Sequence, residues 1–136
     1  MTQSLFTWGA RDHRERITRI AVARLSVGAS VGLTTGVAAR VFGVPRDQVT
    51  PAARAIARLF GVRNCVLAVW ALSVRDASAA EQKRCFQLNA AVDIADLVML
   101  MPLLARRDLR RTAIMSSVLA VNATLAWWEL LQETGT

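Results

Sequence analysis

Residues 84–106 read RCFQLNAAVDIADLVMLMPLLAR, an apolar run with an arginine at each end and two aspartates near its middle. At about 1.5 Å per helical residue, the roughly 20 positions between the arginines extend about 30 Å, the thickness of a bilayer's hydrocarbon core. This length and composition predict a transmembrane helix. A carboxylate at mid-membrane costs about 3 kcal/mol or more, so Asp93 and Asp96 need partners, protons or water there.

The composition of the whole chain favours a membrane protein. Its 136 residues suit one domain, and 54% of them are hydrophobic while only 20% are charged. The net charge of +7 lies mostly between the apolar runs, as in loops that face anionic lipid headgroups. The arginines form no stripe interleaved with aromatic residues, so nucleic acid is not an expected partner. Cys65 and Cys85 lack CxxC spacing and His13 is the one histidine, so we expect no metal and no cofactor.

Four apolar segments determine the predicted fold. The segment of about residues 85–105 joins three others, at about 20–42, 54–74 and 112–131. We therefore predict an all-α fold in which the single domain 1–136 is an antiparallel four-helix transmembrane bundle. A soluble helical bundle is the alternative, because segments interrupted by Arg24 and Arg63 can also be buried core helices.

Capping residues predict where the helices begin and end. Proline at position 51 suits the first turn of a helix, and Glu81 completes a capping box with the serine three residues earlier. Pro102 removes one helical hydrogen bond and predicts a kink near the exit of its span. The expected boundary residues are Gly43 as a C-cap, and Thr50, Ser78 and Asp108 as N-caps.

A repeat of small residues marks the first segment. Gly28, Gly32 and Gly36 recur every four residues, which gives a smooth ridge where another backbone can approach closely. We interpret this ridge as a packing seam against another helix of the same chain. A homodimer seam is the alternative.

The N-terminal segment and the ends of the spans carry residues typical of the membrane interface. Residues 5–8 include leucine, phenylalanine and tryptophan, and residues 11–19 carry i,i+4 pairs, which together predict an interfacial helix; a frayed tail is the alternative. Arg24 is expected to extend to the interface, and Trp127 and Trp128 to join an aromatic belt. Asn122 and Glu129 are seven residues apart, hence on one face of their helix.

Counting from the loops predicts a polar layer inside the membrane. Arg63 lies 12 residues from Arg75, and Asp96 lies 12 residues from Arg84, so both are about 18 Å from the same loop. A similar count from the opposite loop puts Asn122 at the same level. We therefore expect Arg63 and Asp96 to form a salt bridge, with Asp93 one turn away. The candidate ligand-binding residues are Arg63, Asn64, Asn89, Asp93, Asp96 and Asn122.

Three functions fit such a layer. The leading hypothesis is a membrane subunit that binds a lipid headgroup, a small amphiphile, or a partner helix in a homodimer or larger complex. The alternative is an intramembrane enzyme for a lipid or isoprenoid-type substrate, with Asp93 or Asp96 as acid or base and Arg63 orienting it. A buried ion pair that only fixes the helix register is the third. An open pocket at the aspartates would favour binding or catalysis, and a closed, dry pair a structural role.

The sequence ARLFGVR at residues 57–63, together with Asp93 and Asp96, resembles a family of small, uncharacterised four-helix membrane proteins of high-GC bacteria. The resemblance covers about residues 42–131. It implies a four-helix protein of the bacterial inner membrane and no known activity.

The arginines leave the orientation nearly balanced. With both termini on one side of the cell membrane, eight basic residues lie on the terminal side and eight on the other. The first helix usually dominates orientation, which slightly favours cytoplasmic termini.

Overall fold

The computed structural model describes residues 4–134, in which 80% helix and no strand confirm the all-α prediction. The elements in chain order are α1 (His13–Leu33), α2 (Thr35–Val41), the short 3-10 helix η1 (Arg46–Gln48), α3 (Pro51–Ser73), α4 (Ala79–Leu100), the 3-10 helix η2 (Met101–Ala105) and α5 (Arg110–Glu133).

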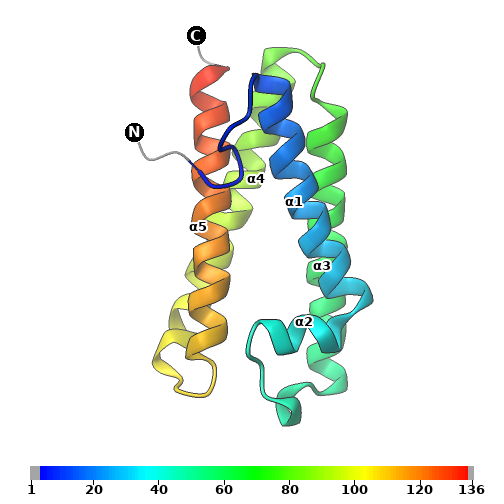
Figure 1. Cartoon of the computed structure of the whole chain (residues 1–136), viewed down its shortest axis with the longest axis vertical. Helices are drawn as coiled ribbons and strands as arrows, with labels where there is room; N and C mark the ends of the chain where they lie inside the picture. The colour runs from blue at the N-terminus through cyan, green and yellow to red at the C-terminus, as the bar shows by residue number, and fades with distance from the viewer. Residues whose placement is uncertain (1–3, 135–136) are drawn as a thin grey trace.

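The four long helices form two pairs, α1 with α3 and α4 with α5 (Figure 1). We call the end of the molecule where α1 begins and α5 ends the upper end; α2, η1 and η2 lie at the lower end. The buried core joins the two pairs in the upper half. Its members are Ile17, Ile20, Ala21, Ala71, Val74, Cys85, Phe86, Ala90, Ala126, Trp127 and Leu130.

Three helices are long and apolar enough to cross a membrane: α3, α4 continued by η2, and α5; α1 and α2 make a fourth if the bent pair counts as one span. In the most apolar stretch of each of these three helices, only 17 to 22% of the residues are buried within the chain. Most side chains of these stretches are therefore at least partly exposed. Leu59 and Met99, for example, are 71% and 76% exposed. So much exposed apolar surface is unusual for a soluble monomer and indicates a multi-pass membrane protein.

Glycines bring α1 and α3 into backbone contact. A Cβ atom added to Gly61 would lie 2.6 Å from the Gly28 carbonyl oxygen and 2.8 Å from the Gly32 nitrogen, so only glycine fits there. The expected seam within the chain is therefore confirmed for Gly28 and Gly32. For Gly36 it is wrong, because a Cβ there would meet nothing within 4 Å.

The expected first span, residues 20–42, corresponds to α1 and α2 together and is not one straight helix. α1 already begins at His13, and it breaks at Thr34, where α2 turns away by 115°. The Thr34 and Thr35 hydroxyls donate to the carbonyls of Ser30 and Val31, four residues earlier, at 2.8 and 2.7 Å. Such bonds bend helices, and glycines on either side of the threonines lower the helix propensity further.

The other apolar segments lie within helices: residues 54–74 overlap α3, residues 85–105 lie in α4 and η2, and residues 112–131 lie in α5. The caps expected at Thr50 and Ser78 are confirmed, and the chain passes into η2 at Met101, next to Pro102. Gly43 is one residue past the cap, because the C-cap of α2 is Phe42 and Gly43 follows it with a φ of +75°. Asp108 as a cap is wrong. The N-cap of α5 is Leu109, while Asp108 accepts hydrogen bonds from Gln48 at 2.9 Å and from Arg106.

The segment before α1 folds back onto α5 as a turn, whereas the helix expected over residues 11–19 is present from His13 as the first turns of α1. The Ser4 hydroxyl and the Leu5 amide donate to the Asn122 Oδ1 atom at 2.9 and 2.7 Å. The Ser4 amide and the Thr7 hydroxyl donate to the two Glu129 carboxylate oxygens at 2.7 and 2.6 Å. Asn122 and Glu129 thus share one face of α5, as predicted, and that face holds the start of the chain.

Candidate functional site

A closed polar network lies in the interior of the helices. Arg24 on α1 donates one hydrogen bond to Asn89 and another to Asp93 Oδ1, both on α4. Trp127 on α5 donates its indole N–H to Asp93 Oδ2 at 3.0 Å. Arg24 is only 7% exposed and Asp93 only 4%. Both carboxylate oxygens therefore have donors, and the network joins three helices of the two pairs.

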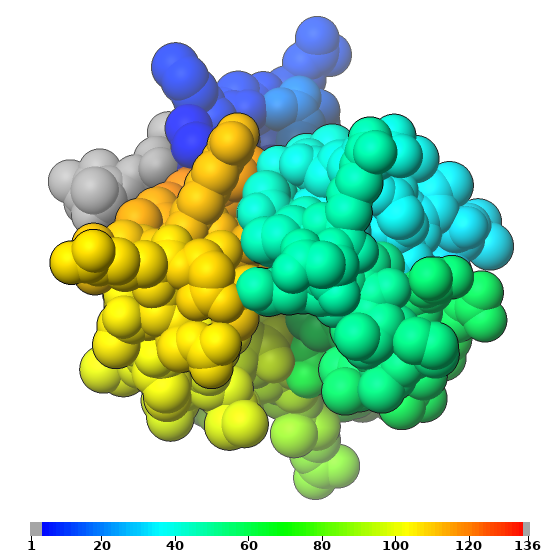
Figure 2. Space-filling model, turned by 90° about the horizontal axis from the view of Figure 1, so that it is seen from below, coloured from blue at the N-terminus to red at the C-terminus, as the bar shows by residue number. Residues whose placement is uncertain are grey.

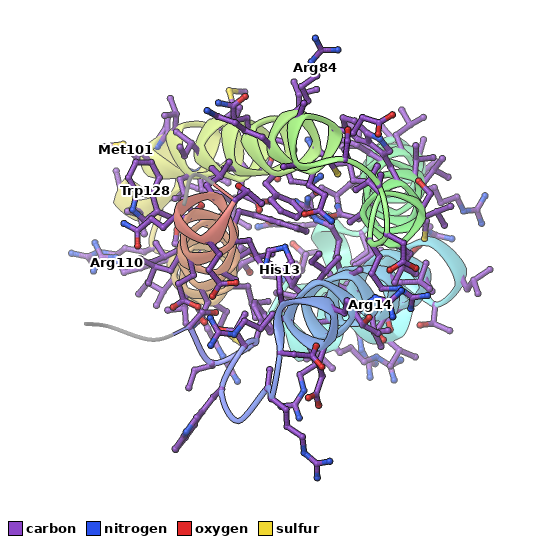
Figure 3. The ribbon with its side chains drawn as sticks, turned by 90° about the horizontal axis from the view of Figure 1, so that it is seen from above. His13, Arg14, Arg84, Met101, Arg110 and Trp128 are labelled. Atoms are coloured by element: carbon purple, nitrogen blue, oxygen red, sulfur yellow. The ribbon has the colours of Figure 1, made fainter. Side chains whose placement is uncertain are left out.

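The structure corrects the expected positions of Arg24 and Trp127. Because α1 begins at His13, Arg24 lies 11 residues, or about 16 Å, from the upper end of the helix and cannot extend to the interface. Trp127 is fully buried and stacks on Phe86 with ring centroids 5.8 Å apart. Of the two tryptophans expected in the aromatic belt, only Trp128, which is 59% exposed, points outward (Figure 3).

A second ion pair lies between α3 and α4. Arg63 Nη2 is 2.5 Å from Asp96 Oδ2, which confirms the predicted salt bridge. Its side chains remain 39% and 24% exposed, in contrast to the closed network around Arg24. The Arg63 guanidinium lies over the Phe60 ring, 4.9 Å from its centroid, and its Nε atom is buried without a hydrogen-bond partner in the described chain.

The predicted single layer is therefore wrong in composition. Asp93 and Asn89 belong to the Arg24 network rather than to Arg63. Asn64 is buried against Gly28 and donates to the carbonyl of its own helix at Phe60, and Asn122 binds the N-terminal segment. The interior instead holds two polar groups: a closed network on Asp93 and a partly open pair on Asp96.

The two hollows described in the structure lie away from both aspartates. One lies in the bend between α1 and α2, and the other lies among charged side chains of α1 and Arg75 at the upper end. Asp93 is 4% exposed and both of its oxygens accept hydrogen bonds, so its carboxylate is enclosed by protein groups. Among residues 4–134, no three His, Cys, Asp or Glu side chains are placed to hold a metal ion.

The upper end carries a set of polar contacts that the sequence pattern did not indicate. His13 lies between α1, α4 and α5 (Figure 3), with Nδ1 2.6 Å from a Glu133 oxygen and Nε2 3.1 Å from Gln82 Oε1. Arg14 Nε donates to Asp76 at 2.5 Å, and this hydrogen bond lowers the pKa of Asp76 below its ordinary value. These contacts close the upper end of the molecule around the core.

The open pair differs chemically from the closed network. In the described chain, Arg63 donates only to Asp96, and only one oxygen of Asp96 accepts a hydrogen bond. The remaining guanidinium N–H groups suit acceptor oxygens such as those of a carboxylate, a phosphate or an amide. The arrangement can therefore hold a polar group, and the nearby carboxylate of Asp93, one turn away on α4, has both oxygens bound within its own network. Compared with protein-family models, curated proteins and solved structures, the chain matches none.

Proposed function

We propose that the protein is a non-catalytic membrane subunit that binds a ligand or partner helix inside the bilayer through Arg63 and Asp96. The observation that carries this proposal is the exposure of the pair, 39% and 24%, in the middle of two apolar helices. Arg63 is 12 residues from the start of α3 and 10 from its end, hence about 18 and 15 Å from the two ends. Charged groups at that depth rarely face lipid tails, so a further group covers them.

The covering group has both an acceptor and a donor. The exposed part of the Arg63 guanidinium, which in the described chain donates only through Nη2 to Asp96, suits a further acceptor oxygen, and the second oxygen of Asp96 can accept from a donor. Phe60 provides an apolar surface beside them. The headgroup of a lipid, the polar end of a small amphiphile, or a polar side chain of a partner helix, including one in a homodimer, meets these requirements.

We propose that the chain forms an antiparallel four-helix transmembrane bundle in which α1 and α2 together make the first crossing. The candidate spans and the outward apolar side chains support this arrangement. Membership of the family of four-helix bacterial proteins stays a prediction. The enzyme alternative loses one of its two candidates, because Asp93 is enclosed by its own hydrogen bonds, and rests on Asp96.

We also propose that the lower end faces the cytoplasm, which reverses the slight preference from the first helix. The pairing of Arg24 with Asp93 removes one arginine from the terminal side and leaves seven basic residues there against eight at the lower end. Labelling of cysteines placed in the loops measures this orientation.

The double substitution Arg63→Leu with Asp96→Leu tests the binding function. Because both charges are removed together, we expect the fold to be kept, while the bound lipid, amphiphile or polypeptide is lost. Native mass spectrometry of the protein extracted from membranes in mild detergent measures the retained mass. Arg58→Leu, an exposed arginine on the same helix, is the matched control and should retain it.

Two results contradict the proposal. One is that the unaltered protein and the double variant carry the same bound masses, so that the pair binds nothing. The other is that the double variant loses its helical circular dichroism, which would give the pair a structural role like that of Arg24 and Asp93.

A further inference from the structure

The bend between α1 and α2 encloses an apolar hollow, which we call the elbow cavity. Its volume is about 310 Å³, at the lower end of the range for small-molecule sites. It is lined by Ser26, Val27, Ser30, Val31, Thr34, Val37, Ala38, Val41 and Phe42. The Ser26 and Thr34 hydroxyls donate to carbonyls of their own helix at 2.8 Å, so the wall offers mainly hydrocarbon surface.

The length and the apolar lining of the cavity suit a hydrocarbon chain. From Ser26 to Thr34 it follows α1 for eight residues, or about 12 Å. Its lining contains no charged side chain and no converging set of polar groups, which a compact polar ligand would need. An extended apolar occupant therefore fits it better than a polar one.

Arg40 belongs to the last turn of α2 and Arg111 lies next to it, although neither lines the cavity, whose walls include Val41 and Phe42 of that turn. Arg40 is exposed next to Val41, and the Arg111 side chain lies against Gly43, where its Cδ is 2.9 Å from the position of an added Cβ. The Thr112 hydroxyl donates to the Phe42 carbonyl at 2.8 Å, which fixes the start of α5 beside α2. No carboxylate of residues 4–134 pairs with Arg40 or Arg111.

The whole lower end has an unbalanced positive charge. Eight arginines and two aspartates leave a formal excess of six, against one at the upper end. Seen from below, the half formed by α2, η1 and α3 meets the half formed by η2 and α5 near the centre of the view (Figure 2). Such a surface attracts the anionic headgroups of a membrane leaflet.

We propose that the elbow cavity binds one anionic phospholipid of the bilayer, with an acyl chain along α1 and its phosphate against Arg40 and Arg111. The charge complementarity selects this occupant, because a zwitterionic lipid offers the same chain without the net negative charge. The inference rests on the membrane location of the chain but is independent of the binding function of Arg63 and Asp96.

Lipid titration of the purified full chain tests the site. In mild detergent, native mass spectrometry follows binding of the first molecule of palmitoyl-oleoyl phosphatidylglycerol or of the corresponding phosphatidylcholine. We expect tighter binding of the phosphatidylglycerol. Arg40→Gln with Arg111→Gln should weaken it by roughly thirtyfold, about fivefold for each arginine, and should weaken phosphatidylcholine binding much less, because choline already balances the charge of that phosphate.

Two further variants separate the chain from the headgroup. Ser30→Trp fills the cavity from an exposed position and should abolish tight binding of both lipids. Arg84→Gln is the matched control, because Arg84 points away from the helices at the upper end (Figure 3), and it should bind phosphatidylglycerol as the unaltered protein does. The Arg63→Leu, Asp96→Leu variant should also keep the elbow lipid.

Equal affinity of the unaltered protein for the two lipids would overturn the proposal without reference to any variant. Unchanged phosphatidylglycerol affinity in the double glutamine variant would overturn it as well. A dimer mass that Ser30→Trp abolishes would assign the cavity to a second copy of the chain instead.

Discussion

Asp93→Ala is expected to lower the free energy of unfolding by about 3 to 5 kcal/mol. The substitution leaves the 7%-exposed Arg24 without its carboxylate and removes the acceptor of the Trp127 N–H group. An isolated buried charge is far more costly than a missing pair, and an unpaired buried donor adds to the loss. Unfolding in mixed micelles with increasing sodium dodecyl sulfate, followed by circular dichroism, measures the change.

Two companion variants distinguish this explanation from a general sensitivity of α4. Asp96→Ala, one turn away, should cost less, because the group that we propose to cover Arg63 still offers it an acceptor. The double variant Arg24→Leu with Asp93→Leu should lose less stability than Asp93→Ala alone, since no charge is stranded. A loss for Asp93→Ala no larger than that for Asp96→Ala would show that the Arg24 network does not hold the helices together.

Gly61→Ala is expected to cost about 3 kcal/mol and to separate α1 from α3. Its new methyl group would lie 2.6 Å from the Gly28 carbonyl oxygen and 2.9 Å from the Gly32 Cα atom. Both contacts are with backbone, which cannot rotate away as a side chain can, so the loss lies at the upper end of the range for overpacking. The same micelle titration measures it.

Gly36→Ala is the control for this prediction. It adds the same methyl group at the third glycine of the repeat, where nothing lies within 4 Å. Because alanine favours a helix more than glycine does, the variant should be neutral or gain up to about 1 kcal/mol. Equal losses at the two positions would show that the close crossing at Gly61 is not what joins the helices.

The features that the sequence predicts correctly are those that depend on a single distance along a regular helix. Counting residues from a shared loop placed Arg63 and Asp96 at one level, and their side chains meet at 2.5 Å. The seam at Gly28 and the caps at Thr50 and Ser78 were predicted for the same reason, since each depends on local spacing and chemistry.

The depth of Arg24 is not predicted correctly from the sequence. Counted from the start of the apolar run Arg24 lies near the end of the span, whereas counted from the true start of the helix it lies deep inside. A signal was present, since Ile17, Ile20, Ala21, Arg24 and Gly28 follow helical spacing and are all buried on one face. An arginine within such a stripe faces the interior. The position of Trp127 is not predictable in the same way. A tryptophan near the end of a span suits an aromatic belt, and the sequence does not show which acceptor its N–H group finds.

The break at Thr34 and the position of the N-terminal segment depend on tertiary structure. Threonines and glycines occur within transmembrane helices, so their presence does not distinguish a bend from a straight span. The contact of Ser4 with Asn122 joins residues 118 positions apart, and no periodic pattern connects them.

The central claim, that the chain crosses a membrane four times, is tested most directly by thiol labelling of loop residues. In a chain whose Cys65 and Cys85 are replaced by alanine, single cysteines are introduced as Asp47→Cys, Ala80→Cys or Arg107→Cys. A membrane-impermeant maleimide is then applied to spheroplasts of a bacterial host, before and after permeabilisation.

We predict that Ala80→Cys is labelled in intact spheroplasts, while Asp47→Cys and Arg107→Cys are labelled only after permeabilisation. The reversed pattern would contradict only the proposed orientation. Equal labelling of Asp47→Cys and Ala80→Cys, which α3 separates, would contradict the four crossings themselves.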